Sequence, residues 1–186
     1  IKDSRPAQTA YVHDSKFIST DPLNRINISE IPSPYTTGLM DGFFGIYKPL
    51  VQFTRGCPFK CAYCSEGGDH WGKVYRKQAE DVEEELEYIA ARSDCRETLH
   101  ISDSNFGMYQ NDIAYAKIIA NKRKKYNWPS SILVATGKNS KETVLEVAKI
   151  LEGQMPLSAS VQSTDLEVLK NVNRKNIIIR KKDGGC

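Results

Sequence analysis

The chain has 186 residues, of which 40% are hydrophobic and 26% are charged, and its formal net charge is +3. These values are ordinary for a globular protein, and the charge is too small to indicate binding to nucleic acid. No apolar run approaches the roughly 18 residues that a membrane-spanning helix needs, and no secretory signal peptide opens the sequence. The composition therefore predicts one hydrophobic core, no nucleic-acid partner and no membrane span.

The first part of the chain, residues 1–48, shows neither a helical nor an alternating apolar period. Prolines separated by Ser, Thr, Asn and Asp predict turns and extended segments. We expect an irregular linker that follows an upstream domain, with Ile26, Ile28 and Ile31 packing onto the next domain. A short helical turn is predicted over residues 38–44.

From residue 49 onwards, strand and helix patterns alternate. Alternation of this kind predicts parallel strands with helices outside them, either as a doubly wound sheet or as a (β/α) barrel. Both architectures place their chemistry at the carboxyl ends of the strands. The pattern ends after about four units, and residues 180–186 read as an irregular tail. The segments are strands at 50–53, 98–102, 131–135, 157–162 and 177–179, and helices at 80–89, 112–125, 140–151 and from 165.

Three of the five cysteines, Cys57, Cys61 and Cys64, follow the first predicted strand at a C-x3-C-x2-C spacing. Clustered thiolates favour zinc, copper(I) or iron–sulfur clusters. Structural zinc usually takes four protein ligands, whereas this loop supplies three. A [4Fe-4S] cluster held by three cysteines keeps one iron open to another ligand. The alternative is a structural or interaction module in which His70 or Cys95 completes a zinc site.

This spacing, with Tyr63 directly before the last cysteine, resembles the signature of the radical S-adenosylmethionine (radical SAM) enzymes. Three further segments occur in the order of the branch that commonly carries an N-terminal cobalamin-binding domain. They are residues 31–39 (IPSPYTTGL), 102–107 (SDSNFG) and 160–163 (SVQS). The resemblance implies that residues 49–179 form a partial (β/α) barrel, as a fragment of the family's core.

The same resemblance implies that the three cysteines hold a [4Fe-4S] cluster whose free iron binds S-adenosylmethionine (SAM). Reductive cleavage of SAM would give a 5′-deoxyadenosyl radical for hydrogen abstraction or for cobalamin-linked methyl transfer on a small molecule. The chain lacks a D-x-H-x-x-G motif, so cobalamin would come from a domain outside it. Such an enzyme needs an electron donor such as flavodoxin or ferredoxin. Clustered thiols also favour the reducing cytoplasm.

Contacts to SAM are expected from two places on the same resemblance. The first is formed by Tyr63, which would lie against the adenine, and by Ser102 and Asp103 at the end of the second predicted strand. An acid there would receive the ammonium group of SAM, a charge-assisted pairing. Ordinary loop packing of Tyr63 and a capping role for Asp103 remain alternatives.

The second place is later in the chain. Ser160 and Gln162 alternate on the fourth predicted strand and so share one face, where a ribose or carboxylate would satisfy them. If that strand were an edge, both side chains would face water. Arg174 falls where the family often has an arginine that meets the carboxylate of SAM.

Overall fold

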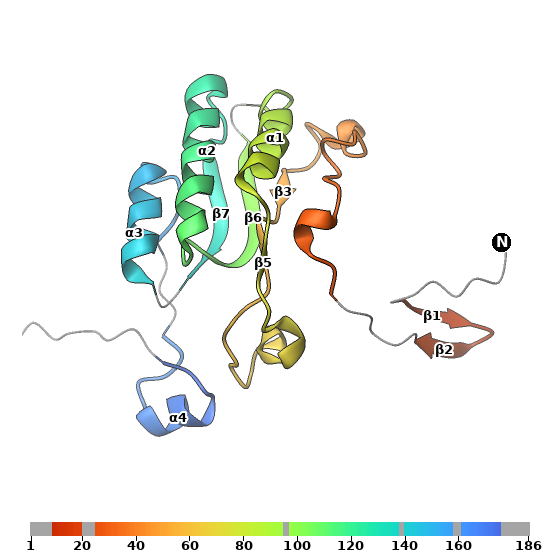
Figure 1. Cartoon of the computed structure of the whole chain (residues 1–186), viewed down its shortest axis with the longest axis vertical. Coiled ribbons are helices and arrows are strands. Elements are labelled where there is room, and N and C mark those ends of the chain that lie inside the picture. The colour runs from red at the N-terminus through yellow and green to blue at the C-terminus, as the bar shows by residue number, and fades with distance from the viewer. Residues whose placement is uncertain (1–8, 20–24, 95–96, 138–139, 158–160, 176–186) are drawn as a thin grey trace, which may run out of the picture.

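The computed structural model describes residues 9–19, 25–94, 97–137, 140–157 and 161–175 (Figure 1). At its centre lies a three-stranded sheet in which both strand pairings are parallel. The spatial order is β3 (Leu50–Val51), β6 (Thr98–Phe106) and β7 (Ser131–Thr136). This confirms the α/β class with a parallel sheet.

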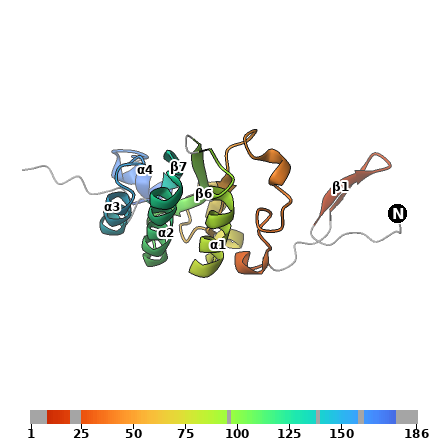
Figure 2. The ribbon, with the colours of Figure 1, turned by 90° about the horizontal axis from the view of Figure 1, so that it is seen from above.

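Three helices stand side by side along one face of the sheet (Figures 1 and 2). They are α1 (Ala79–Ala90), α2 (Gln110–Tyr126) and α3 (Lys141–Ile150). A fourth helix, α4 (Leu166–Asn171), lies apart from this layer, and Asp165 caps its first turn through Oδ1. Among the described residues, no helix is both long and apolar enough to cross a bilayer.

The core lies between the sheet and this helix layer. Val82, Leu86 and Ile89, which the sequence places on one face of a helix, are fully buried on α1. They pack with Leu99 and Ile101 of β6 in one apolar cluster. Among the described residues, no helix covers the other face of the sheet (Figure 2).

Short elements complete the described chain. Near the N-terminus they are β1 (Ala10–His13), β2 (Lys16–Ser19), the 3-10 helix η1 (Ile28–Glu30) and the 3-10 helix η2 (Asp41–Phe43). After β3 they are β4 (Thr54–Arg55), η3 (Ser65–Gly67), η4 (Asp69–Trp71) and β5 (Tyr75–Arg76).

The segment before β3 is more ordered than the expected linker. β1 and β2 form an antiparallel hairpin that projects from the rest of the chain (Figure 2). Ile28 is buried as expected, whereas Ile26 and Ile31 are 50% and 39% exposed, so the predicted packing is wrong for these two. The helix η2 falls inside the helical turn predicted at 38–44. The Tyr35 hydroxyl accepts the Leu50 N–H at 2.9 Å and donates to the Leu50 carbonyl at 3.0 Å, so it covers backbone groups of the edge strand β3.

Three predicted strands differ from the structure. β3 ends at Val51 instead of residue 53 because the Phe53 N–H donates to the Asp103 carboxylate rather than to a neighbouring strand. β6 runs to Phe106, four residues beyond the predicted end. The prediction of a strand over 157–162 is wrong for the described residues 157 and 161–162, and residues 158–160 and 177–179 lie outside the described chain.

Candidate active site

A short two-stranded ribbon holds the base of the cysteine loop. β4 and β5 pair antiparallel, with Thr54 opposite Arg76 and Arg55 opposite Tyr75. The Cys57 N–H then donates to the Trp71 carbonyl at 2.9 Å. The loop is thereby closed by backbone hydrogen bonds and extends from the sheet at the end of β3 (Figure 1).

Two glycines allow the loop to fold this tightly. Gly56 has φ +113°, and a Cβ there would lie 2.4 Å from the Lys73 carbonyl oxygen. A Cβ on Gly67 would lie 2.2 Å from the Cys61 carbonyl oxygen. Both distances are too short for any other residue, so the backbone path around the cysteines requires glycine at these points.

Two of the three thiols are buried and accept hydrogen bonds. Cys57 is 8% exposed, and Asn105 Nδ2 donates to its Sγ at 3.3 Å. Cys61 is 6% exposed, and the Arg174 guanidinium donates to its Sγ at 3.3 Å. Cys64 is exposed to solvent. Both buried sulfurs therefore have a hydrogen-bond donor that would orient them as metal ligands.

This donor set fits a [4Fe-4S] cluster. Iron–sulfur clusters take cysteine thiolates as protein ligands, and the loop offers three cysteines within the eight residues from Cys57 to Cys64. Among the described residues, no three histidine, cysteine or acidic side chains gather closely enough to hold a single metal ion. A cubane cluster distributes three cysteines over three different irons, so it does not require them to converge on one point.

The end of α4 closes one side of the loop. The Ala62 N–H donates to the Val172 carbonyl at 3.1 Å, and Asn173 Nδ2 donates to the Lys60 carbonyl at 3.0 Å. A groove of about 510 Å³ lies between the loop and α4, and it is lined in part by Phe59, Lys170, Arg174 and Lys175. Segments more than a hundred residues apart in sequence therefore meet at the cysteines.

The first group of expected SAM contacts, Tyr63, Ser102 and Asp103, lies in three different environments. Tyr63 is 54% exposed, and partial desolvation, followed by the neighbouring Cys61 thiol, raises its pKa. Ser102 faces away from the helix layer and donates to the Val51 carbonyl at 3.1 Å. Asp103 is only 2% exposed, lies within β6 rather than at its end, and accepts the Phe53 N–H at 2.8 Å.

Of the second group of expected SAM contacts, Ser160, Gln162 and Arg174, the structure places only Arg174 beside the cysteines. Gln162 is exposed in an irregular segment, and Ser160 lies outside the described residues. Arg174 reaches the site, but its guanidinium contacts Cys61 Sγ and lies 5.7 Å from the ring centroid of Phe59. The structure thus brings Arg174 to the cysteines and leaves Gln162 facing solvent.

A buried polar layer lies beneath the loop, formed by Arg76, Asp103, Tyr109 and Asp112. Burial raises the pKa of Asp103 to about 7 and that of Asp112 to about 6, although backbone N–H groups partly oppose both shifts. Burial likewise raises the pKa of Tyr109 to about 12. The Arg76 guanidinium lies 4.0 Å from the Tyr109 ring centroid, and its charge lowers the pKa of Tyr109 and of Asp112 against the larger effect of burial.

Sequence reasoning gave no role to Asn105, the residue that contacts Cys57. The signal was available in the alternation Leu99, Ile101, Asp103, Asn105, which continues the buried face of β6 beyond its predicted end. The register between β6 and β7 shifts between Ile101 and Phe106. Such an irregularity re-aims side chains, and only the structure shows that it directs Asn105 to a thiol.

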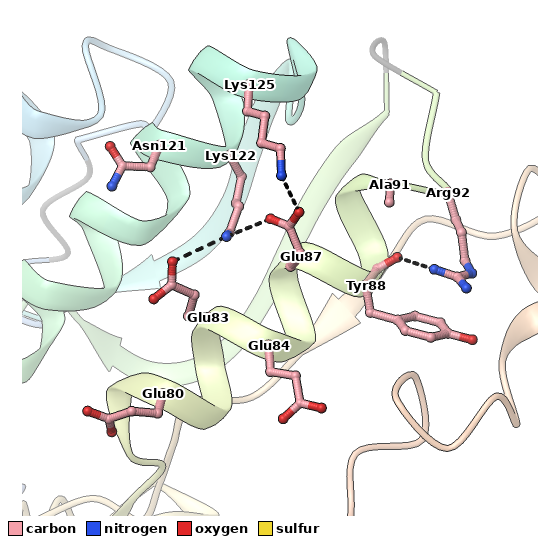
Figure 3. A pocket seen from close by; sticks show the side chains of 10 residues that line it. All are labelled: Glu80, Glu83, Glu84, Glu87, Tyr88, Ala91, Arg92, Asn121, Lys122 and Lys125. Carbon is pink, nitrogen blue, oxygen red and sulfur yellow. Dashed lines mark hydrogen bonds and ion pairs between the residues drawn. The ribbon is translucent and has the colours of Figure 1, made fainter.

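A larger hollow, of about 810 Å³, lies elsewhere, on the outer face of α1 and α2 (Figure 3). Figure 3 shows Lys122 between Glu83 and Glu87, with Nζ–O distances of 3.4 and 2.7 Å. Lys125 also pairs with Glu87, at 2.5 Å. This surface holds matched charges that join the two helices, and it contains none of the cysteines.

Comparison with known proteins agrees with this site. A family model for the Radical SAM superfamily matches residues 51–180. The 2-(S-pantetheinyl)-carbapenam-3-carboxylate methyltransferase of Streptantibioticus cattleyicolor is 34% identical over 176 residues, covering 89% of this chain and 26% of the relative. The cobalamin-dependent radical SAM methyltransferase TokK of Streptomyces tokunonensis is 33% identical over 158 residues, covering 80% of this chain and 23% of the relative.

Solved structures show the same fold. The cobalamin-dependent SAM radical enzyme OxsB, with aqua-cobalamin and SAM bound, aligns with a TM-score of 0.55 and 18% identity, covering 88% of this chain and 25% of OxsB. The structure of OxsB with aqua-cobalamin alone gives the same values. At this level of identity the likeness concerns the fold.

The chain belongs to the radical SAM superfamily. Its similarity to TokK confirms the predicted resemblance to the cobalamin-associated branch. Membership implies a [4Fe-4S] cluster and SAM as cofactors of this class of enzyme. The chain spans about a quarter of the length of the curated relatives that it matches.

Proposed function

We propose that this chain forms the cofactor-binding core of a radical SAM enzyme, in which Cys57, Cys61 and Cys64 hold a [4Fe-4S] cluster. The observation that carries the proposal is the cysteine loop itself, closed at its base by the β4–β5 ribbon, with donors on two of its sulfurs. When bound, the cluster and SAM supply a 5′-deoxyadenosyl radical through one-electron cleavage of SAM.

The chain's own residues position and shield that chemistry. Cys57 and Cys61 are buried, so the protein excludes water from two of the cluster's ligands, while Cys64 and Tyr63 lie on the open side where SAM would enter. Tyr63 offers an exposed aromatic face for the adenine. Ser102 is exposed on the face of the sheet opposite the helices α1–α3, where it would meet a bound ligand.

Of the remaining candidates, the structure supports some better than others. Asp103 is better explained by its contact with the Phe53 N–H than by a contact with the SAM ammonium, because its carboxylate is buried on the helix side of β6. Gln162 and Ser160 remain proposed SAM contacts that require the chain after Leu157 to fold over the site. Arg174 already donates to Cys61 Sγ, so a contact with the SAM carboxylate would require its side chain to move.

We also propose that the sheet is part of a (β/α) barrel whose interior is the face without helices. Leu50 and Leu133, on that face of the strands β3 and β7 that flank β6, are 49% and 54% exposed, so large apolar side chains on this face are open to solvent. Further strands would cover them in the whole protein. A barrel interior there places SAM at the carboxyl ends of the strands, as in other barrel enzymes.

The reaction proposed for the whole protein is methyl transfer to a small molecule, with cobalamin bound by a domain outside this chain. This rests on the similarity to two methyltransferases, one of them cobalamin-dependent. The reaction would also require a low-potential electron donor, such as flavodoxin or ferredoxin, and a reducing compartment such as the cytoplasm.

The test is SAM cleavage by the whole protein, reconstituted with iron and sulfide without oxygen and reduced with dithionite. The proposal predicts formation of 5′-deoxyadenosine by the unaltered protein and none by the Cys57→Ala variant. A protein that contains iron and sulfide but forms no 5′-deoxyadenosine, with or without added cobalamin, would contradict the proposed activity. Stoichiometric zinc in place of iron would support the structural module instead.

A further inference from the structure

Asn105 lies where a side chain can act on the proposed cluster without binding it. Its side chain is buried, and its Nδ2 donates to Cys57 Sγ at 3.3 Å. The backbone around it is fixed as well, because its carbonyl accepts the Met108 N–H at 3.2 Å. A Cβ on Gly137 would lie 3.1 Å from that same carbonyl, so the neighbouring chain packs directly against it.

Arg174 acts on a second sulfur from the opposite side. Its guanidinium donates to Cys61 Sγ at 3.3 Å, and its backbone N–H donates to the Leu169 carbonyl at 2.8 Å, which anchors the residue to the end of α4. Phe59 lies 5.7 Å below the guanidinium carbon. The donor therefore has a defined position despite its long side chain.

We propose that Asn105 and Arg174 raise the reduction potential of the cluster by donating hydrogen bonds to two of its three cysteine sulfurs. The inference rests on the proposed cluster. When one electron from a low-potential donor enters the cluster, negative charge on its sulfurs increases and no bond breaks. An N–H donor, and still more a guanidinium, stabilises the more negative state, so the reduced form is favoured.

The two donors act in different surroundings. Asn105 is neutral, and the buried position beside Cys57 weakens screening of its dipole. Arg174 carries a full charge but is only partly buried, so solvent screens it. Each is a positioning residue, which acts through a cysteine and does not itself touch the substrate.

The experiment is a reductive titration of the whole protein after anaerobic reconstitution, without SAM, with the reduced cluster followed by electron paramagnetic resonance. Iron and sulfide contents are measured first for every variant. Asn105→Leu removes the donor at similar size and is expected to retain the cluster. At the midpoint potential of the unaltered protein, we expect the ratio of reduced to oxidised cluster in Asn105→Leu to be about tenfold lower. For one electron this corresponds to a midpoint potential lower by about 59 mV.

Arg174→Gln is expected to lower the midpoint in the same direction, and Arg174→Lys is expected to recover most of the loss because it retains the charge and a donor. Two controls match these changes. Ser104→Ala alters the neighbouring residue of β6, whose hydroxyl donates to Glu66 rather than to a thiol. Lys170→Gln removes a positive charge from the same groove without a sulfur contact.

The outcomes separate this inference from the proposed function. Absence of iron and sulfide in the unaltered protein would refute the cluster itself. With the cluster present, an unchanged midpoint in both Asn105→Leu and Arg174→Gln would overturn the inference. A shift in Lys170→Gln as large as that in Arg174→Gln would also overturn it for Arg174, because the effect would then be one of net charge. If Asn105→Leu does not load, Asn105→Ala removes the same donor, and an unchanged midpoint in both Asn105→Ala and Arg174→Gln would overturn the inference.

Discussion

Asp103 shows how a residue in the expected place can serve the fold. The family resemblance predicts that it ends a strand and receives the SAM ammonium, with capping as the alternative, and in the structure its carboxylate accepts the Phe53 N–H at 2.8 Å. No sequence pattern distinguishes these roles, because both place an acid near the carboxyl end of a parallel strand. The difference depends on β6 continuing to Phe106, which buries the carboxylate.

This burial predicts a pH dependence of stability. The pKa of Asp103 is raised from 3.8 to about 7, so the folded protein retains a proton that the unfolded chain releases. Its contribution to the free energy of unfolding is therefore greatest below about pH 4, falls as the pH rises to about 7 and is constant above that, with a total change of at most about 4 kcal/mol.

Urea denaturation of the cofactor-free protein at pH 5 and pH 7.5 measures this effect. Asp103→Asn can still accept the Phe53 N–H but does not titrate, so the loss of stability between the two pH values should be smaller in the variant. Asp112, whose pKa is raised to about 6, gives a background in the same direction for both proteins. Equal losses in both proteins would show that Asp103 is ionised in the folded state.

Gly56 supplies a second prediction for a single residue. Gly56→Ala would place a Cβ 2.4 Å from the Lys73 carbonyl at a φ of +113°, so the loop must shift. We expect the variant to lose most of its iron after reconstitution. Gly68→Ala is the matched control, since a Cβ there has no atom within 4 Å and its φ is −74°. Normal iron content in Gly56→Ala would mean that the loop does not need this path.

The helices were the most predictable elements. The spacing of Val82, Leu86 and Ile89 alone identifies the buried face of α1, since apolar periodicity is a local property. The β1–β2 hairpin was not predicted, because its turn uses Asp14 and Ser15 at φ of 49° and 56°, where a glycine would normally signal such a turn. The β4–β5 ribbon was missed because two-residue strands carry no period.

The ionic contacts between α1 and α2 predict an asymmetry between two substitutions. Lys122 is buried and its ammonium pairs with Glu87 and Glu83. Lys122→Met removes the buried charge together with its desolvation cost, so we expect the free energy of unfolding to change by less than about 1 kcal/mol or to rise. Glu87→Gln leaves the ammonium with a weaker partner and should cost about 1 kcal/mol, reduced by solvent screening.

Thermal or urea denaturation measures both variants. Glu84→Gln serves as a control, because Glu84 lines the same hollow on α1 and α2 and is exposed to solvent. A larger loss of stability in Lys122→Met than in Glu87→Gln would mean that the ion pair is a net source of stability.

In the part of the chain that the structure describes, the sheet has one face covered by helices and one without (Figure 2). If the bare face is a barrel interior, Leu133→Ala in the whole protein should cost about 2–5 kcal/mol, as for a buried leucine. Leu145 on α3 is the matched control, with 48% exposure against 54% for Leu133, and Leu145→Ala should change stability by about 0.5 kcal/mol or less. Equal, small effects would show that the face remains open to solvent.

The family and its α/β class could be read from the sequence because the cysteine spacing and the alternation of elements are local patterns. The hydrogen bonds to the thiols could not be predicted from the sequence, because Asn105 and Arg174 lie 48 and 113 residues away from the cysteines that they contact. Their approach depends on the β6 irregularity and on the docking of α4 against the loop.

The most direct test of the account is the iron and acid-labile sulfide content of the whole protein, purified and reconstituted without oxygen, beside that of Cys61→Ala. The account predicts about four iron and about four sulfide per chain at this site in the unaltered protein, and loss of that iron and sulfide in the variant. Neither element in the unaltered protein, or the same iron content in Cys61→Ala, would contradict it.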